Sequence, residues 1–116
     1  MELVIVESPY AGNIEANVEY ARKAMSDCLK RGEAPFASHL LYTQPGVLRD
    51  EVQEDRNLGI AAGFCWAEVA DKTVVYVDRG VSKGMIQGMI NAQQKGRKIE
   101  LRTIEQEGAQ LNVEVE

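Results

Sequence analysis

Apolar and polar positions along the chain repeat with two periods, one typical of strands and one typical of helices. Short apolar runs rich in valine and isoleucine indicate strands, and longer segments with apolar side chains on one helical face indicate helices. The predicted strands are residues 3–6, 34–37, 73–77 and 98–103, and the predicted helices are residues 14–31, about 50–69 and 82–95. This β-α-β-α-β-α-β order predicts an α/β fold in which a parallel sheet carries helices on both faces.

Capping residues indicate where the predicted helices begin and end. Asn13 precedes the first helix, Gly32 follows it, and Ser82 precedes the third. Asn and Ser side chains accept hydrogen bonds from a first helical turn, and glycine favours the conformation that ends a helix. The second helix is expected to begin near Asp50, where acidic side chains suit the positive end of the helix dipole. We interpret the acidic residues between positions 50 and 55 as a solvated helix face rather than a metal site.

The last segment, residues 105–116, is polar apart from Leu111, Val113 and Val115. Their spacing of two residues predicts an extra edge strand or a contact in a homo-oligomer, and the alternative is a frayed tail. The sequence does not decide between these interpretations. The chain is therefore divided into an α/β domain, residues 1–104, and a C-terminal strand or tail, residues 105–116.

Composition limits the classes of partner. The 116 residues suffice for one domain, with a formal net charge of −5 and a pI of about 4.9. Extended nucleic acid is not an expected partner, because neutralising its phosphates requires a basic face. No apolar run approaches the roughly 20 residues of a membrane span, and the first residues lack the features of a signal peptide. We expect a cytoplasmic protein, located in the host cytoplasm if the gene is viral.

The two cysteines and the single histidine do not form a recognisable metal site. Cys28 and Cys65 have no metal-ligand spacing, and we expect both to be reduced, buried and inert. No metal and no other cofactor is expected. A small anionic ligand remains compatible with the acidic chain, because backbone amides at a helix N-terminus bind anions locally.

Two loops that follow predicted strands, residues 8–13 and 78–85, carry candidate ligand-binding residues. The candidates are Ser8, Tyr10, Gly12 and Asn13 in the first loop and Asp78, Ser82, Lys83, Gly84 and Met85 in the second. Ligands of parallel sheets bind beyond the carboxyl ends of the strands. Tyr10 can stack on a base or sugar, and the helix start at Ser82 with Lys83 beside it suits a phosphate or carboxylate. The alternative interpretation of each loop is an ordinary turn between a strand and a helix.

His39 and Arg56 are further candidates outside these loops. His39 follows the second predicted strand and can donate a hydrogen bond or act as a base. A structural role is the alternative for this lone histidine. Arg56 belongs to the second predicted helix and is expected to face the ligand edge of the sheet.

Four segments together resemble a known family. S-P-Y-A-G-N, P-F-A-S-H-L-L-Y, D-R-N-L-G-I and S-K-G-M-I-Q-G-M-I-N-A occur in this order. They resemble the short, often phage-encoded relatives of the nucleoside 2-deoxyribosyltransferases, over about residues 3–101. The resemblance implies a Rossmann-like parallel sheet, assembly into homo-oligomers, and loops that hold the base, the sugar or its 5′-phosphate. It also implies that Asp71 stands where the family has an aspartate before the third strand.

The resemblance fails at the catalytic position. In the enzymes, the third helix supplies a glutamate in a pattern like G-M-x-x-E-I-x-x-A, and that carboxylate attacks the anomeric carbon. Residues 84–92 of this chain are G-M-I-Q-G-M-I-N-A, so Gly88 occupies the position of the nucleophile. Glycine has no side chain for covalent catalysis, and we expect Gly88 to widen the ligand pocket. Close packing of the helix is the alternative explanation for a glycine here.

The sequence thus favours a binding protein over an enzyme. The expected ligand is a nucleoside, a nucleotide or an ADP-ribose-like molecule, and a viral protein of this kind would sequester a nucleotide immune signal. The alternative function is an N-glycosidase or deoxyribosyltransferase that uses another carboxylate, with Asp71, Asp78, Glu51 or a residue of a neighbouring subunit as candidates. A third interpretation is an interaction module with an empty pocket.

Overall fold

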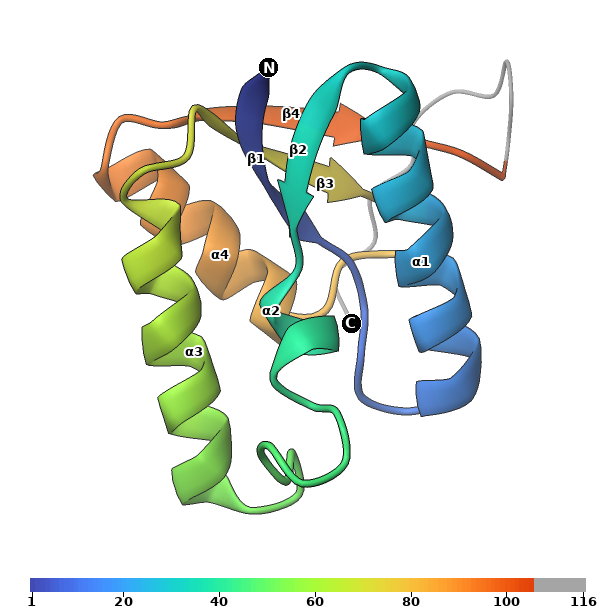
Figure 1. The fold of residues 1–116 in the computed structure, drawn as a ribbon, viewed down its shortest axis with the longest axis vertical. Helices are drawn as coiled ribbons and strands as arrows, with labels where there is room; N and C mark the ends of the chain where they lie inside the picture. The colour runs from blue at the N-terminus through green and yellow to red at the C-terminus, as the bar shows by residue number, and fades with distance from the viewer. Residues whose placement is uncertain (106–116) are drawn as a thin grey trace.

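Four parallel strands form one sheet in the computed structural model, which describes residues 1–105 (Figure 1). The strands are β1 (Glu2–Glu7), β2 (Glu33–Phe36), β3 (Lys72–Tyr76) and β4 (Lys98–Arg102), in the order β2-β1-β3-β4. All three pairings are parallel, as the sequence predicts. The predicted C-terminal strand with Leu111, Val113 and Val115 lies outside the described residues.

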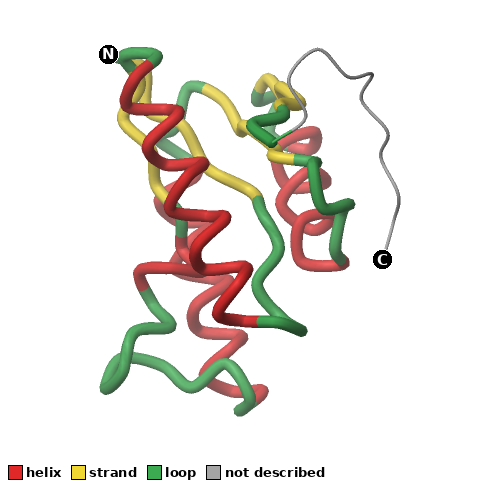
Figure 2. Tube along the Cα trace, turned by 90° about the vertical axis from the view of Figure 1, so that its right-hand side faces the viewer, coloured by secondary structure: helices red, strands yellow, loops and turns green. Residues whose placement is uncertain are grey.

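Helices cover both faces of this sheet, which confirms the predicted α/β architecture. They are α1 (Ile14–Lys30), α2 (Ser38–Leu41), α3 (Gln53–Ala67) and α4 (Lys83–Gln94). Figure 2 shows the strands between α1 and α4, and α3 lies against α2 and α4. No helix among residues 1–105 is both long and apolar enough to cross a bilayer.

The two faces of the sheet carry separate apolar cores, because successive side chains of a strand point to opposite sides. Val4 and Tyr76 pack with Tyr20 and other residues of α1 on one side. Val75 packs with Met85 of α4 on the other side. Full burial of a side chain of this size contributes roughly 1.5–3 kcal/mol, so these residues hold both helix layers on the sheet.

Caps define α1 and α4 as the sequence predicts. The Asn13 side chain accepts a hydrogen bond from the Ala16 amide at the start of α1. Ser82 accepts one from the Met85 amide at the start of α4. Gly32, just after α1, has a φ of 80°, the left-handed conformation that ends a helix without strain in glycine.

The segment between β2 and α3 departs from the prediction. Residues 38–41 form the short helix α2, and α3 begins at Gln53 instead of near Asp50. Asp50 lies in the turn before α3, and the Asp55 carboxylate accepts a hydrogen bond from the Arg49 amide. The acidic residues therefore stabilise a turn as well as a helix start, which charge patterning alone does not distinguish.

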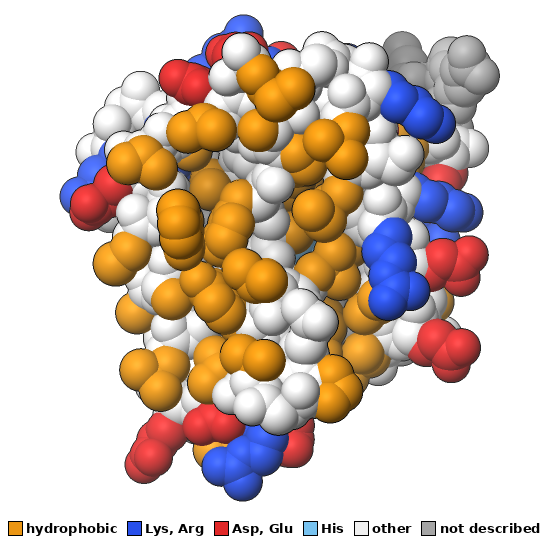
Figure 3. All heavy atoms as spheres, in the orientation of Figure 1, with side chains coloured by type: hydrophobic (Ala, Val, Ile, Leu, Met, Phe, Trp, Pro, Cys, Tyr) orange, Lys and Arg blue, Asp and Glu red, His pale blue; other side chains and the backbone are white. Residues whose placement is uncertain are grey.

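The expected burial of the cysteines is correct for Cys28 and wrong for Cys65, which is exposed. Cys65 lies on α3, where Leu58 and Trp66 are also 62% and 54% exposed, while Ile60 and Phe64 on the same helix are partly buried. Figure 3 shows many apolar side chains on the face that Figure 1 presents. An apolar run predicts burial only when a neighbouring element covers it, and the outer side of α3 has no such cover among residues 1–105.

A buried ion network joins strands β2, β3 and β4. The Arg102 guanidinium donates to both carboxylate oxygens of Glu33, with N···O distances of 2.8 and 2.6 Å. The Lys72 ammonium lies 2.9 Å from Glu33 Oε2. The Arg102 and Glu33 side chains are only 4% and 7% exposed, so each charge is stabilised by the other in place of water.

Candidate functional site

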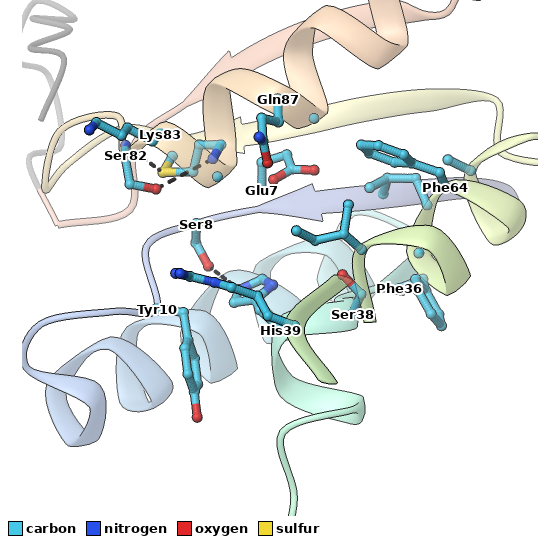
Figure 4. Close-up of a pocket in the computed structure, with 18 of the residues that line it drawn as sticks. Glu7, Ser8, Tyr10, Phe36, Ser38, His39, Phe64, Ser82, Lys83 and Gln87 are labelled. Carbon is cyan, nitrogen blue, oxygen red and sulfur yellow. Dashed lines mark hydrogen bonds between the residues drawn. The ribbon is translucent and has the colours of Figure 1, made fainter. Parts of the chain in front are cut away.

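A cavity of about 350 Å³ opens at the carboxyl ends of β1, β2 and β3 (Figure 4). Nine of the residues proposed from the sequence line it: Ser8, Tyr10, His39, Arg56, Ser82, Lys83, Gly84, Met85 and Gly88. They come from the β1–α1 loop, from α2 and α3, and from the start of α4. Segments far apart in the sequence therefore meet at one place.

The strand order explains why the cavity forms here. The chain leaves β1 for β2 on one side and returns to β3 on the other side of β1. At such a point the loops after neighbouring strands turn to opposite faces of the sheet and leave a crevice between them. The α1 connection follows β1 and the α4 connection follows β3, which places the two predicted loops on either side of the crevice.

Polar groups gather at the start of α4. The Ser82 hydroxyl accepts a hydrogen bond from the Met85 amide at 3.4 Å. Lys83 and Gly84 belong to the first turn, whose amides have no acceptor within the helix, and both residues line the cavity. This end of the helix therefore offers amide donors, the positive pole of the helix dipole and one ammonium group to an anionic group.

Ser8 and His39 form a pair on the opposite side of the β1 terminus, as Figure 4 shows. Ser8 Oγ lies 2.7 Å from His39 Nε2. Burial lowers the pKa of His39 from 6.5 to about 4, so the imidazole is neutral at physiological pH. A neutral imidazole presents one acceptor and one donor, and the pair can hold a hydroxyl group of a ligand.

Aromatic side chains form the apolar walls. Tyr10, Phe36 and Phe64 line the cavity together with Ile60. The Phe36 ring packs against the Trp66 ring, with centroids 5.5 Å apart, and this contact supports its position. A mostly apolar cavity with a few polar groups on its rim is typical of a small-molecule site.

Three cations, Arg56, Lys83 and Arg97, line the cavity beside these walls. Arg56 lines the cavity from α3, and its guanidinium Nε lies 3.7 Å from Asp50 Oδ1. Lys83 lines it from α4. Arg79, a further cation of the second loop, is bound to Glu105 with N···O distances of 3.0 and 2.9 Å instead.

Gly12 and Asn13, also proposed from the sequence, are not among the residues that line the cavity. Gly12 is exposed and has a φ of 99°, so it allows the turn into α1. The Asn13 side chain is occupied by its bond to the Ala16 amide, at 3.2 Å. Both residues shape the loop that carries Tyr10.

Two of the three carboxylates proposed for an enzyme, Asp71 and Asp78, have structural partners away from the cavity, and the third, Glu51, is exposed in the turn before α3. Asp78 accepts hydrogen bonds from the Tyr20 hydroxyl at 2.7 Å and from the Ile104 amide at 2.9 Å. Asp71 lies just before β3, at the amino end of the sheet, where its carboxylate accepts from the Leu3 amide at 2.7 Å. None of the three residues belongs to the cavity lining.

Glu7 lines the cavity, and the sequence analysis did not consider it. It is the last residue of β1 and directly precedes Ser8. Burial raises the pKa of its carboxyl group from 4.5 to about 8, opposed by the charge of Arg97. The signal in the sequence was a single acidic residue at the end of an apolar strand, at the edge where ligands bind.

Gly88 faces Glu7. A Cβ atom built on Gly88 would overlap the Glu7 carboxyl group, and even the more distant oxygen, Oε1, would be only 2.9 Å away. Figure 4 shows the Glu7 side chain beside Gln87 of α4. The expectation that Gly88 widens the pocket is therefore wrong, because a carboxyl group fills the space that glycine leaves.

Comparisons with known proteins agree with the fold. A family model described as a domain of unknown function (DUF7768) matches residues 2–102. Curated proteins give no match. Among solved structures, a 2-deoxyribosyltransferase from the psychrotolerant bacterium Bacillus psychrosaccharolyticus has a TM-score of 0.60 and 16% sequence identity, over 95% of this chain and 77% of that one. At this identity the match shows a shared deoxyribosyltransferase-like fold.

Proposed function

The chain belongs to the DUF7768 family, and we propose that it binds a nucleoside, a nucleotide or an ADP-ribose-like derivative in the cavity beyond β1 and β3. The observation that carries this proposal is the meeting of aromatic walls, cations and a capped helix N-terminus in one cavity of about 350 Å³. This volume lies within the range of small-ligand pockets.

The aromatic walls suit a base. Tyr10, Phe36 and Phe64 line the cavity, and stacking on aromatic rings is the sequence-tolerant way in which proteins hold bases. The neutral Ser8–His39 pair supplies a donor and an acceptor for a sugar hydroxyl or a base edge.

The start of α4 suits a phosphate. The free first-turn amides and Lys83 lie on one side of the cavity, and Arg56 lines it from α3. A fixed group of donors of this kind binds a phosphate even though the whole chain has a net charge of −5.

The known activity of a fold relative supports the same ligand class. The Bacillus psychrosaccharolyticus protein is a 2-deoxyribosyltransferase, and this chain shares its fold. Gly88, in place of a helix carboxylate, favours retention of the ligand over covalent transfer from α4. In a viral setting, such a protein would sequester a nucleotide immune signal.

Calorimetry with nucleosides, their 5′-monophosphates and ADP-ribose tests the proposal. We expect binding of at least one of them. Lys83→Gln is expected to weaken a phosphorylated ligand about tenfold and to leave the matching nucleoside unchanged, because one charge-assisted bond is lost. The exposed Lys30→Gln, at the far end of α1, is the matched control. Absence of heat with every ligand in the panel would exclude the proposed function.

We also propose that the chain forms homo-oligomers through the exposed apolar side of α3. Leu58 and Trp66 are more than half exposed there, and a contiguous exposed apolar patch is a typical site of association between proteins. Sedimentation velocity is expected to show a species larger than 12.9 kDa. Leu58→Glu should shift it to the monomer, and a wild-type protein that sediments as a monomer would refute the assembly.

A further inference from the structure

The Glu7 carboxyl group occupies a position that only a glycine at residue 88 allows. It projects from the end of β1 toward α4 and lies over the Cα of Gly88, where any Cβ would collide with it. A glycine in the interior of a helix weakens that helix, and α4 contains Gly88 six residues after its cap. The space above Gly88 is thus built around a carboxyl group.

The carboxyl group makes no hydrogen bond or ion pair with residues 1–105, and no fully buried polar side-chain atom among them lacks a partner, so its oxygens are open to the cavity that Glu7 lines. Arg97 is the cation that acts on it, but its guanidinium is held by Thr73 Oγ1 at 2.9 Å, the Ala67 carbonyl at 3.1 Å and Asn91 Oδ1 at 2.7 Å. Glu7 is therefore free to offer its carboxyl group to a ligand.

Burial keeps this group protonated at neutral pH, since its pKa is raised to about 8. A protonated carboxylic acid beside a ligand is a proton donor whose strength suits general acid catalysis near neutral pH. The other charged or titratable residues of the cavity wall are Tyr10 in the β1–α1 loop, His39 on α2, Arg56 on α3, Lys83 on α4 and Arg97 after α4. Among these, the neutral His39 lies with Ser8 on the other side of the β1 terminus.

We propose that Glu7 is the general acid of an N-glycosidic hydrolase, donating its proton to the base of a bound nucleoside or nucleotide as the bond from base to sugar breaks. This inference rests on the proposed ligand class and assigns a reaction to the same cavity. A proton delivered to the departing group assists cleavage of a glycosidic bond, and a carboxylic acid is the usual donor.

The step balances with water as the second reactant. The electron pair of the glycosidic bond leaves with the base, which takes the proton from Glu7. Water adds to the anomeric carbon, and its proton returns to the Glu7 carboxylate. The products are the free base and the free sugar or sugar phosphate, and Glu7 ends in its starting state.

Chromatography of each ligand after incubation with the protein measures release of the base. The wild type is expected to release base from a ligand that it binds in calorimetry. Glu7→Gln keeps the shape of the side chain and removes the acid, and should slow release by about 100-fold or more while the Kd changes less than about threefold. The exposed Glu68→Gln is the matched control and should keep the wild-type rate.

Two further readouts separate catalysis from a structural effect. Base release by the wild type should fall as the pH rises through about 8, where Glu7 loses its proton, and the residual rate of Glu7→Gln should lack this decline. Gly88→Ala should also slow release, by about tenfold or more, because its methyl group displaces the carboxyl group.

The outcomes distinguish the two proposals. Binding without base release, or equal rates for the wild type and Glu7→Gln, would overturn the role of Glu7 and leave the binding function intact. Absence of binding to every ligand would overturn both.

Discussion

Replacing Arg102 with methionine is expected to lower the free energy of unfolding by about 3 kcal/mol, a large fraction of the stability of a small domain. The guanidinium holds both oxygens of the buried Glu33 carboxylate, and methionine fills similar space without a charge or donors. Lys72 stays 2.9 Å from Glu33 and limits the loss. Urea unfolding followed by circular dichroism at pH 7 measures the change.

The same network predicts acid sensitivity. The hydrogen bonds from Arg102 hold the pKa of Glu33 at about 2, below its ordinary 4.5. The unfolded chain takes up its proton first as the pH falls, so this part of the stability is present above pH 4.5 and is lost as the pH falls through about 2. The loss of stability as the pH falls from 4.5 through about 2 should be smaller in Arg102→Met.

An exposed ion pair is the control for the Arg102 prediction. Arg31→Met removes the pair with Asp27, in which the arginine side chain is 47% exposed, and should change stability by less than about 1 kcal/mol. If Arg102→Met is as stable as Arg31→Met, the buried network does not hold the fold.

The second large effect is a gain of stability. Glu7→Gln is expected to be more stable than the wild type by about 2–4 kcal/mol at pH 9 and by less than about 1 kcal/mol at pH 5. The wild-type carboxyl group has a pKa of about 8 when folded, against the ordinary 4.5, because it is buried. Glutamine has similar shape and no proton to lose.

The sign follows from which state releases its proton first. Below pH 4.5 both states keep the proton, and between pH 4.5 and about 8 the unfolded state loses it first, so the stability of the wild type falls as the pH rises. Urea unfolding of both proteins at the two pH values measures the difference, with Glu68→Gln as the exposed control. A stability difference independent of pH would show that Glu7 is not a buried acid.

A stability gain in Glu7→Gln, together with loss of base release, would identify Glu7 as a functional residue kept at the expense of stability. A residue with only a structural role should lower stability when it is replaced. The free energy of unfolding and the rate of base release thus test the role of Glu7 independently.

The family resemblance suggests restoring a carboxylate on α4 by the substitution Gly88→Glu, and the position of Glu7 affects the design of this experiment. Adding a carboxylate to α4 by Gly88→Glu alone would force it against the carboxyl group already there. A test of a carboxylate on α4 therefore needs the double variant Glu7→Ala with Gly88→Glu.

The sequence by itself determined the class of the fold, the order of its elements and the edge where the cavity lies. Apolar periodicity and helix caps are local properties, and the alternation of strands and helices restricts the sheet to few topologies. Tyr10, His39 and Ser82 could be placed at the cavity because they follow the carboxyl ends of strands, and Gly88 because of the family resemblance.

Only the tertiary structure decided which carboxylates face the cavity. Asp71 and Asp78 are bound to backbone amides elsewhere, and Glu7 meets Gly88 across 80 positions of sequence. A side chain acquires its partners, its burial and its pKa from neighbours that are distant along the chain. For that reason, the sequence predicted the loops beyond β1 and β3 as candidate binding segments and did not predict Glu7 between them.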